Sequence, residues 1–368
     1  MIPEWLDAAP WMEWTRRADR AAVARALEAE EPGIREFATL LSPLAAGDLE
    51  ALAQRVQALT RRHFGRTISL YAPLYLSNYC CSGCVYCGFA ASRRIPRHKL
   101  TGEELEAELE ALNGMGVEEI LLLTGERTAT AGYDYLRECV ARAAAHFHSV
   151  TVEVFPMSEE EYRGLAEAGA TWVTLYQETY DAARYQRLHT GGPKRDYMAR
   201  LEAPARALAG GMRVAGLGAL LGLGDPRFDM LSLYRHAAHL RQHYWRGGVS
   251  LSFPRVRPEV GGYTPEFDVD ERMLAQIIFA FRICLPDVPL TLSTRESARF
   301  RDGMAGVGIS KMSVASRTTV GGYGERAATD AGQFEVNDGR DRDAFCRMLR
   351  AKGLQPVFKN WDGIYRSC

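Results

Sequence analysis

The chain has 368 residues, of which 47% are hydrophobic and 25% charged, and its formal net charge is −1. This length fits two domains or one large α/β barrel, and the balanced charge leaves no basic surplus for holding nucleic acid. No apolar run reaches the roughly 18 residues of a membrane span, and the N-terminus lacks the pattern of a signal peptide. We therefore expect a cytoplasmic protein with no nucleic-acid or membrane partner.

Residues 1–66 are predicted to form an N-terminal helical extension. Apolar residues recur at three- and four-residue spacing in residues 19–30, 33–45 and 47–65, which is typical of amphipathic helices. Asp48 is expected to cap the last of these helices and Gly65 to end it.

From Thr67 onward the pattern changes to short runs rich in β-branched and aromatic residues, separated by helical segments. Eight strands are predicted, at residues 67–76, 118–125, 149–156, 170–178, 213–222, 248–255, 288–296 and 308–316. Eight strands that alternate with helices are what a complete (β/α)8 TIM-type barrel requires. An open, doubly wound α/β sheet stays as the alternative, because the number of strands does not prove that the sheet closes.

The predicted barrel therefore spans residues 67–316. Residues 317–368 are expected to form a C-terminal extension that packs on the barrel, with a Gly-rich stretch, one helix and an extended tail.

Four of the eight cysteines lie within residues 80–87, in the sequence "CCSGCVYC" after the first strand. Cys80, Cys84 and Cys87 form a C-x3-C-x2-C set, whose three thiolates can ligate three irons of a [4Fe-4S] cluster and leave the fourth iron open. Cys81 gives a competing set with Cys84 and Cys87. Structural zinc is the alternative, but it prefers four ligands and no second Cys or His pair follows.

Other polar and Gly-rich segments fall where the predicted strands end, which is the face that carries the chemistry of such barrels. They comprise Tyr75, Thr124 to Glu126, Glu153, Glu178, Gly216 and Gly218, Arg255, and Ser293 with Arg295.

The cysteine motif, with Tyr86 as the aromatic of C-x3-C-x-aromatic-C, resembles the signature of the radical S-adenosylmethionine (radical SAM) superfamily. The resemblance implies a [4Fe-4S] cluster whose open iron binds S-adenosylmethionine, the source of a 5'-deoxyadenosyl radical. It also implies further cofactor-binding residues: Thr124, Gly125 and Glu126 for the ammonium group, Glu153 and Glu178 for the ribose, and Gly216 and Gly218 beside the adenine.

Further segments, among them "YQETY", "SFPRVRP" and "STRESARFRD", resemble the aromatic amino acid lyase branch of this superfamily over almost the whole chain. The resemblance implies cleavage of the Cα–Cβ bond of L-tyrosine to 2-iminoacetate (dehydroglycine) and 4-cresol, for thiamine thiazole biosynthesis. The implied partners are a reducing electron donor of the flavodoxin or ferredoxin type and a thiazole synthase complex.

In this interpretation Arg295 binds the tyrosine carboxylate, because its planar guanidinium can donate two parallel hydrogen bonds. Ser293 assists it, Tyr75 lies near the substrate amine, and Arg255 is a weaker candidate for the site. The alternatives are a surface ion pair of Arg295 with Glu296 or Glu271, and a packing role for Tyr75 in the barrel.

Three other functions remain open. The tyrosine lyases of hydrogenase maturation hold a second cluster in a C-terminal extension, but after residue 316 only Cys346 and Cys368 are present here. A lyase or synthase for another aromatic amino acid is possible, and so is a non-catalytic iron–sulfur protein. His236, His239 and His243 are expected on one face of a helix on the barrel exterior. Four isolated cysteines are expected to be buried or incidental thiols: Cys139, Cys284, Cys346 and Cys368.

Overall fold

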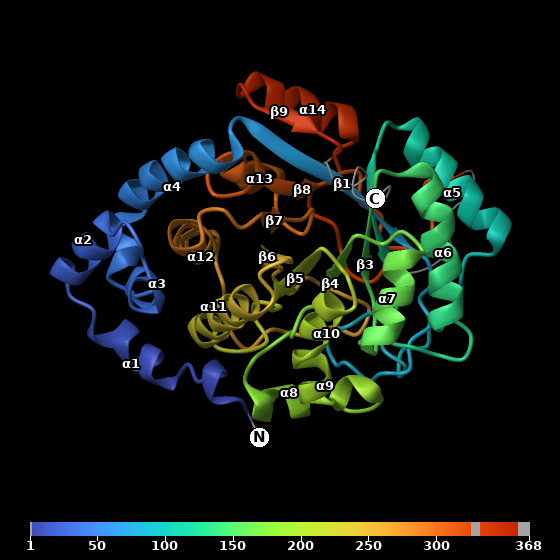
Figure 1. Ribbon diagram of the computed structural model, residues 1–368, viewed down its shortest axis with the longest axis horizontal. Helices are drawn as coiled ribbons and strands as arrows, with labels where there is room; N and C mark the ends of the chain where they lie inside the picture. Colours follow the sequence, from blue (N-terminus) through green and yellow to red (C-terminus); the bar gives the residue numbers. More distant parts are fainter. Residues whose placement is uncertain (1, 325–331, 360–368) are drawn as a thin grey trace.

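The computed structural model describes residues 2–324 and 332–359 and shows a closed barrel of parallel strands surrounded by helices (Figure 1). Its eight strands are β1 (Thr67–Tyr75), β2 (Glu119–Leu123), β3 (Ser149–Glu153), β4 (Trp172–Thr174), β5 (Val214–Gly218), β6 (Gly248–Ser252), β7 (Leu290–Leu292) and β8 (Lys311–Ser313). Each is shorter than its predicted run, because residues at one or both ends of the run lie outside the hydrogen-bonded ladder, in the loops that join strands to helices. The predicted (β/α)8 fold is confirmed.

Strand β1 closes the barrel. It pairs in parallel with β8 along Ser69–Tyr71 and with β2 along Ala72–Tyr75, so the alternative of an open sheet is wrong. A ninth strand, β9 (Gln355–Val357), pairs with residues 67–69 of β1, before the segment that pairs with β2. This part of the predicted extended tail therefore joins the sheet, whereas Cys368 lies outside the described residues.

The barrel helices begin at residues whose side chains accept hydrogen bonds from the first turn. Thr101 and Ser158 accept from the backbone N–H groups of Glu104 and Glu161, which satisfies donors that have no partner within the helix. The helices between the strands are α5 (Gly102–Gly114), α6 (Tyr133–His146), α7 (Glu159–Glu167), α8 (Ala182–Leu188), η3 (Pro193–Arg195), α9 (Tyr197–Leu201), α10 (Ala203–Ala209), α11 (Pro226–His243), α12 (Glu271–Cys284) and α13 (Ala298–Met304). None of the helices in the described ranges is long and apolar enough to cross a membrane.

The predicted N-terminal extension is helical and packs against α11 and α12 on one side of the barrel (Figure 1). It comprises η1 (Glu4–Leu6), α1 (Ala9–Arg17), α2 (Arg20–Glu28), α3 (Ile34–Leu40), η2 (Ala45–Asp48) and α4 (Leu49–Phe64). Gly65 ends α4 with φ +62°, as expected, but Asp48 makes no capping hydrogen bond because it closes the preceding 3-10 turn.

The histidines of α11 lie on the outside of the barrel as expected, but the N-terminal segment covers two of them. Trp5 stacks on His239, and His236 is buried and hydrogen bonded through Nδ1 to the Tyr180 hydroxyl. These histidines therefore help to dock the N-terminal segment. At the C-terminal end, α14 (Arg342–Ala351) is the predicted helix of the C-terminal extension and buries Cys346, while Cys139 and Cys284 are buried in α6 and α12.

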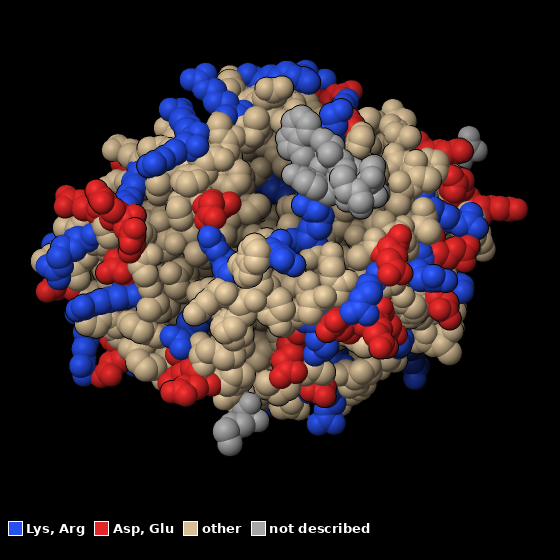
Figure 2. All heavy atoms as spheres, viewed as in Figure 1, with Lys and Arg blue, Asp and Glu red and all other residues tan. Residues whose placement is uncertain are grey.

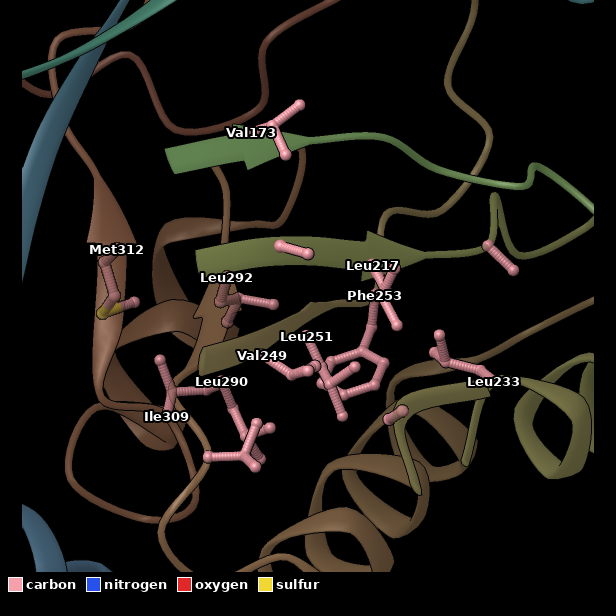
Figure 3. Close-up of a cluster of buried hydrophobic side chains, with 14 of the residues drawn as sticks. Val173, Leu217, Leu233, Val249, Leu251, Phe253, Leu290, Leu292, Ile309 and Met312 are labelled. Carbon is pink, nitrogen blue, oxygen red and sulfur yellow. The ribbon is translucent and has the colours of Figure 1, made fainter. Parts of the chain in front are cut away.

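The two faces of the strands differ in chemistry. Outward-facing aliphatic residues such as Val249, Leu251 and Leu290 pack toward the surrounding helices and form the main core (Figure 3). Most inward-facing positions are polar or aromatic, with Leu121 as an aliphatic exception. The polar and aromatic residues that line a cavity inside the barrel include Tyr71, Glu119, Thr151, Trp172, Ser250 and Lys311. Alternation along each strand thus separates an apolar outer core from a polar interior.

An ion pair between Lys311 of β8 and Glu119 of β2 lies in this interior, and the Lys311 ammonium also lies 3.8 Å from the centroid of the Trp172 ring. We predict that Lys311→Ala lowers the free energy of unfolding by about 3–5 kcal/mol, because Glu119 is left buried without its partner. Urea unfolding measures this difference. A double variant, Lys311→Met with Glu119→Leu, should recover most of the loss, and a single-variant cost below about 1 kcal/mol would contradict the prediction.

Charged groups on the outer surface follow no single sign. Figure 2 shows basic and acidic side chains interspersed over the visible face, with a hollow near its centre. This distribution agrees with the formal net charge of −1.

Candidate active site

The loop between β1 and α5 brings three of the four clustered cysteines to one cavity. Cys80, Cys84 and Cys87 line an open cavity of about 610 Å³ at the C-terminal ends of the strands, here called the cluster cavity. The rest of its wall comprises Tyr75, Phe89, Leu123, Thr124, Gly125, Glu126, Glu153, Val154, Tyr176, Glu178, Lys194, Arg200 and Gln333. Cys81 is exposed, and its thiol lies 2.8 Å from the carbonyl oxygen of Arg127, away from this cavity.

The three thiols fit a cluster that takes one thiolate on each of three irons. The Glu126 N–H donates to Cys80 Sγ at 3.4 Å, and the Gln333 side-chain amide donates to Cys87 Sγ at 3.6 Å. Burial raises the pKa of Cys84 to about 12, against the opposing charge of Lys194, so metal binding must displace its proton. In the described ranges, no three His, Cys, Asp or Glu side chains are close enough to share a single metal ion.

The segment after β2 packs closely against the start of the cysteine loop. A Cβ atom at Gly125 would lie 2.4 Å from the Tyr79 carbonyl oxygen and 2.6 Å from Cys80 Cβ, so only glycine allows this approach. Thr124 and Glu126, on either side of it, both line the cluster cavity. The three residues expected from the sequence therefore lie against Cys80.

We predict that Gly125→Ala lowers the iron content reached on anaerobic reconstitution, because the added methyl group displaces Cys80, an overpacking that typically costs about 1–3 kcal/mol. Iron and sulfide analysis measures it. Gly191→Ala is the matched control, since a Cβ at Gly191 meets nothing within 4 Å. Equal iron content in the two variants would contradict the prediction.

A group of buried charges forms another part of the wall of the cluster cavity. Lys194 of η3 donates to Glu178 at 2.6 Å, and Arg200 of α9 donates to Glu126 at 2.9 Å and lies 3.5 Å from Glu178. Burial alone raises the pKa of Glu178, but the two cations outweigh it and hold that pKa below its usual value. Glu126 and Glu178 were expected from the sequence, whereas Lys194 and Arg200 were not.

The backbone at Glu178 is in the left-handed region, with φ +70°, which is costly for a residue with a Cβ atom. The two following residues anchor it: the Thr179 hydroxyl donates to Asp229 Oδ1 at 2.9 Å, and the Tyr180 N–H donates to the same oxygen at 2.7 Å. Asp229 on α11 is buried, and burial raises its pKa to about 7. This helix therefore fixes the direction in which Glu178 points.

Tyr86, the aromatic of the cysteine motif, is buried and held by a histidine that sequence analysis did not single out. Its hydroxyl lies 2.7 Å from His189 Nε2, and His189 Nδ1 lies 2.8 Å from the Tyr185 carbonyl oxygen. Burial lowers the pKa of His189 to about 3, so the ring is neutral. Nδ1–H then donates to the carbonyl oxygen and Nε2 accepts from Tyr86.

A second cavity of about 490 Å³, here called the substrate cavity, adjoins the first. Ser293 and Arg295 line it, and it shares Tyr75, Leu123, Glu153 and Tyr176 with the cluster cavity. A third cavity is lined by both Cys87 and Arg295. The predicted metal ligands and the predicted carboxylate-binding residue therefore face neighbouring cavities that share part of their walls.

Arg295 does not form either of the ion pairs considered as alternatives. Glu296 binds Arg255 and Arg257, and Glu271 binds Arg299. The Arg295 guanidinium instead stacks on the Phe334 ring, with its carbon 3.3 Å from the ring centroid. Arg255 lines none of the three cavities and serves the ion pair with Glu296, so it is not part of the site.

Tyr75 contacts both cavities and is held by the C-terminal extension. Its hydroxyl donates to Gln333 Oε1 at 2.6 Å, and its ring packs edge-on against Phe89. Gln333 thus joins Tyr75 to Cys87, and the neighbouring Phe334 supports Arg295. The sequence did not predict a role for Gln333 or Phe334, because the segment that contains them has no regular periodicity.

Gly216 and Gly218 do not line the cluster cavity. A Cβ at Gly216 would lie 2.6 Å from Thr174 Oγ1, and one at Gly218 would lie 2.6 Å from the Tyr176 ring. These glycines make room for side chains of the neighbouring strand inside the barrel. Leu220, two residues further on, is the part of this segment that reaches a cavity at the strand ends.

Known families match most of the chain. The radical SAM superfamily profile matches residues 74–237, and that of the Biotin and Thiamin Synthesis associated domain matches residues 252–355. The crystal structure of HydG, a maturase of the [FeFe]-hydrogenase, superposes with a TM-score of 0.92 at 29% identity and covers 98% of this chain and 82% of its own. Methylornithine synthase (PylB) shares the fold, with a TM-score of 0.73 at 21% identity over 94% of this chain and 99% of its own.

Two relatives match over nearly their whole length. The 2-iminoacetate synthase of Escherichia coli (strain K12) is 46% identical over 93% of this chain and 91% of its own. That of Salmonella typhimurium (strain LT2) is 42% identical over 98% of this chain and 94% of its own. Together with the cysteine motif at the barrel mouth, these matches show that the chain belongs to the 2-iminoacetate synthase family of radical SAM enzymes.

Proposed function

We propose that the protein is a radical SAM lyase that cleaves the Cα–Cβ bond of L-tyrosine to 2-iminoacetate and 4-cresol, for thiamine thiazole biosynthesis. The observation that carries the proposal is the proximity of two sites: three thiols for a [4Fe-4S] cluster face one cavity, and Arg295 with Ser293 faces the neighbouring cavity, which shares part of its wall. Radical cleavage needs its cofactor and substrate held side by side in such a space.

Residues of the cluster cavity would hold the cofactors. Cys80, Cys84 and Cys87 would ligate the cluster, with Tyr86 packed behind them, and the segment Thr124 to Glu126 would face the ammonium group of S-adenosylmethionine. Glu178 is the candidate for the ribose hydroxyls, because its carboxylate is kept ionised beside the cysteines. When bound, the cluster and S-adenosylmethionine supply a radical that removes one hydrogen atom from the substrate.

Residues of the substrate cavity would orient tyrosine. The Arg295 guanidinium is free of acidic partners within the described residues and lies over the Phe334 ring, so it can receive the substrate carboxylate, with Ser293 in the same cavity. Tyr75 is fixed by Gln333 between Arg295 and the cysteines. Its pKa is raised well above the usual value, by burial and by Glu153, so its hydroxyl keeps its proton.

A low-potential electron donor must reduce the cluster, and we propose one of the flavodoxin or ferredoxin type. We also propose that the product passes to a thiazole synthase complex, and that the protein works in the cytoplasm, where a reducing environment protects its thiols. Copurification under anaerobic conditions tests the complex directly.

The direct test is anaerobic. The reconstituted protein is given S-adenosylmethionine, dithionite and L-tyrosine, and 5'-deoxyadenosine and 4-cresol are quantified together. Both products are expected with tyrosine. Deoxyadenosine without cresol would retain the radical chemistry but point to another aromatic amino acid, such as tryptophan, which is tested in parallel. If the protein carries a full cluster but forms neither 5'-deoxyadenosine nor 4-cresol, the proposal is wrong.

A further inference from the structure

Glu153, at the C-terminal end of β3, differs from every other carboxylate of the site. It lines all three cavities at the barrel mouth, and its side chain makes no hydrogen bond within residues 2–324 and 332–359. Glu126 and Glu178, in contrast, are bound by Arg200 and Lys194. Glu153 is therefore the carboxylate of this site that is available to a ligand.

The charges around Glu153 suit the two charged groups of an amino acid. Among the charged groups that act on Glu153, Arg295 has the largest effect. Arg295 lines two of the three cavities that Glu153 lines, yet the two side chains form no ion pair with each other. An α-amino acid carries its carboxylate and its ammonium on the same carbon. With the carboxylate bound to Arg295, the ammonium group falls on the side where Glu153 supplies the opposite charge.

We propose that Glu153 is a catalytic acid–base residue that takes one proton from the substrate ammonium before cleavage and returns it to the departing benzyl fragment. This inference rests on the proposed tyrosine lyase activity. It reassigns Glu153 from the ribose of S-adenosylmethionine, for which Glu178 remains the candidate.

The proposed series of proton, hydrogen-atom and electron transfers conserves atoms and electrons. Loss of a proton from the ammonium to Glu153 gives a neutral amine, from which one hydrogen atom is then removed. The Cα–Cβ bond breaks to give 2-iminoacetate and a 4-hydroxybenzyl radical. One electron from a low-potential donor and the proton held by Glu153 convert this radical to 4-cresol, so the reaction consumes no proton from solvent overall.

The setting of Glu153 allows both directions of transfer. Burial raises the pKa of Glu153 to about 7, with Arg295 opposing the rise, and this lies far closer to the working pH than the usual value for a glutamate. The titratable and charged groups that act on it are Arg295 after β7, Glu178 after β4, Arg200 of α9, Lys194 of η3, Tyr71 and Tyr75 of β1, and Tyr176 after β4. The cations cannot accept a proton, and the tyrosines hold theirs.

The test compares Glu153→Gln with Glu178→Gln in the reconstituted enzyme. We expect Glu153→Gln to bind S-adenosylmethionine and L-tyrosine with dissociation constants within about threefold of wild type, while its rate of 4-cresol formation falls at least about 100-fold. Glu178→Gln should instead weaken S-adenosylmethionine binding. Glu153→Asp should restore part of the rate.

The pH dependence separates a catalytic role from a structural one. In wild type, kcat/KM for tyrosine should rise through a pKa of about 7, as Glu153 ionises. In Glu153→Gln the rise of kcat/KM near pH 7 should disappear. The residual rate should rise only near pH 9–10, where the amine of free tyrosine loses its proton. The inference would be overturned if Glu153→Gln lost tight binding of S-adenosylmethionine. It would also be overturned if the rate and pH profile of this variant were unchanged. Absence of 4-cresol from wild type would refute the lyase activity instead.

Discussion

Replacing Cys84 by alanine will abolish formation of both 5'-deoxyadenosine and 4-cresol, whereas replacing Cys81 by alanine will leave both products close to wild-type levels. Cys84 is buried in the wall of the cluster cavity, but Cys81 is exposed and faces Arg127. A cube held by only three thiolates loses an indispensable ligand in the first variant and none in the second.

The two variants form a matched pair, because they differ only in which cysteine of one loop is removed. Iron analysis and electron paramagnetic resonance after anaerobic reconstitution measure the cluster independently of turnover. Wild type and Cys81→Ala should hold about four irons per chain, and Cys84→Ala should hold less and lack the signal of a reduced cluster. Loss of the cluster in Cys81→Ala would show that Cys81, and not Cys80, completes the ligand set.

Arg295→Gln is expected to reduce kcat/KM for tyrosine at least about 100-fold, equivalent to about 3 kcal/mol. The substitution removes two charge-assisted hydrogen bonds to the substrate carboxylate from a half-buried side chain. Most of the loss should appear as a higher KM for tyrosine, with the affinity for S-adenosylmethionine unchanged.

Arg299→Gln is the control for this variant, because Arg299 lies nearby on α13 but its side chain is exposed and binds Glu271. It should leave both kinetic constants unchanged. Steady-state kinetics with tyrosine, together with binding of S-adenosylmethionine by equilibrium dialysis, distinguish the outcomes. A tenfold or smaller loss in Arg295→Gln would contradict the assignment of Arg295 to the carboxylate.

The parts of the site that the sequence predicted are local to a strand end. Cys80, Cys84 and Cys87 share one loop, and a short loop forces its residues into one neighbourhood whatever the rest of the chain does. The positions of Arg295 and Glu178 followed from the same rule, because the C-terminal ends of parallel barrel strands meet on one face. The eight strands were likewise visible in the alternation of strands and helices.

The residues that were missed come from connecting segments. Lys194 and Arg200 lie in the connection between β4 and β5, where cations usually face solvent, and only the fold turns them toward Glu178 and Glu126. Gln333 is separated from Tyr75 by 258 positions along the chain, yet their side chains are hydrogen bonded. No periodicity in the sequence could show such a contact.

The sequence by itself determined that strands alternate with helices and that one loop carries enough cysteines to ligate a cluster, because both properties depend on residue type and local spacing. The tertiary structure alone decided that the sheet closes and that Cys80 rather than Cys81 faces the cavity. It also decided that Glu296 binds Arg255 and Arg257 but not Arg295, and which glutamate keeps a carboxylate without a partner in the described chain. Those outcomes depend on which side chains the closed barrel brings within hydrogen-bonding distance, and that proximity is a property of the folded chain.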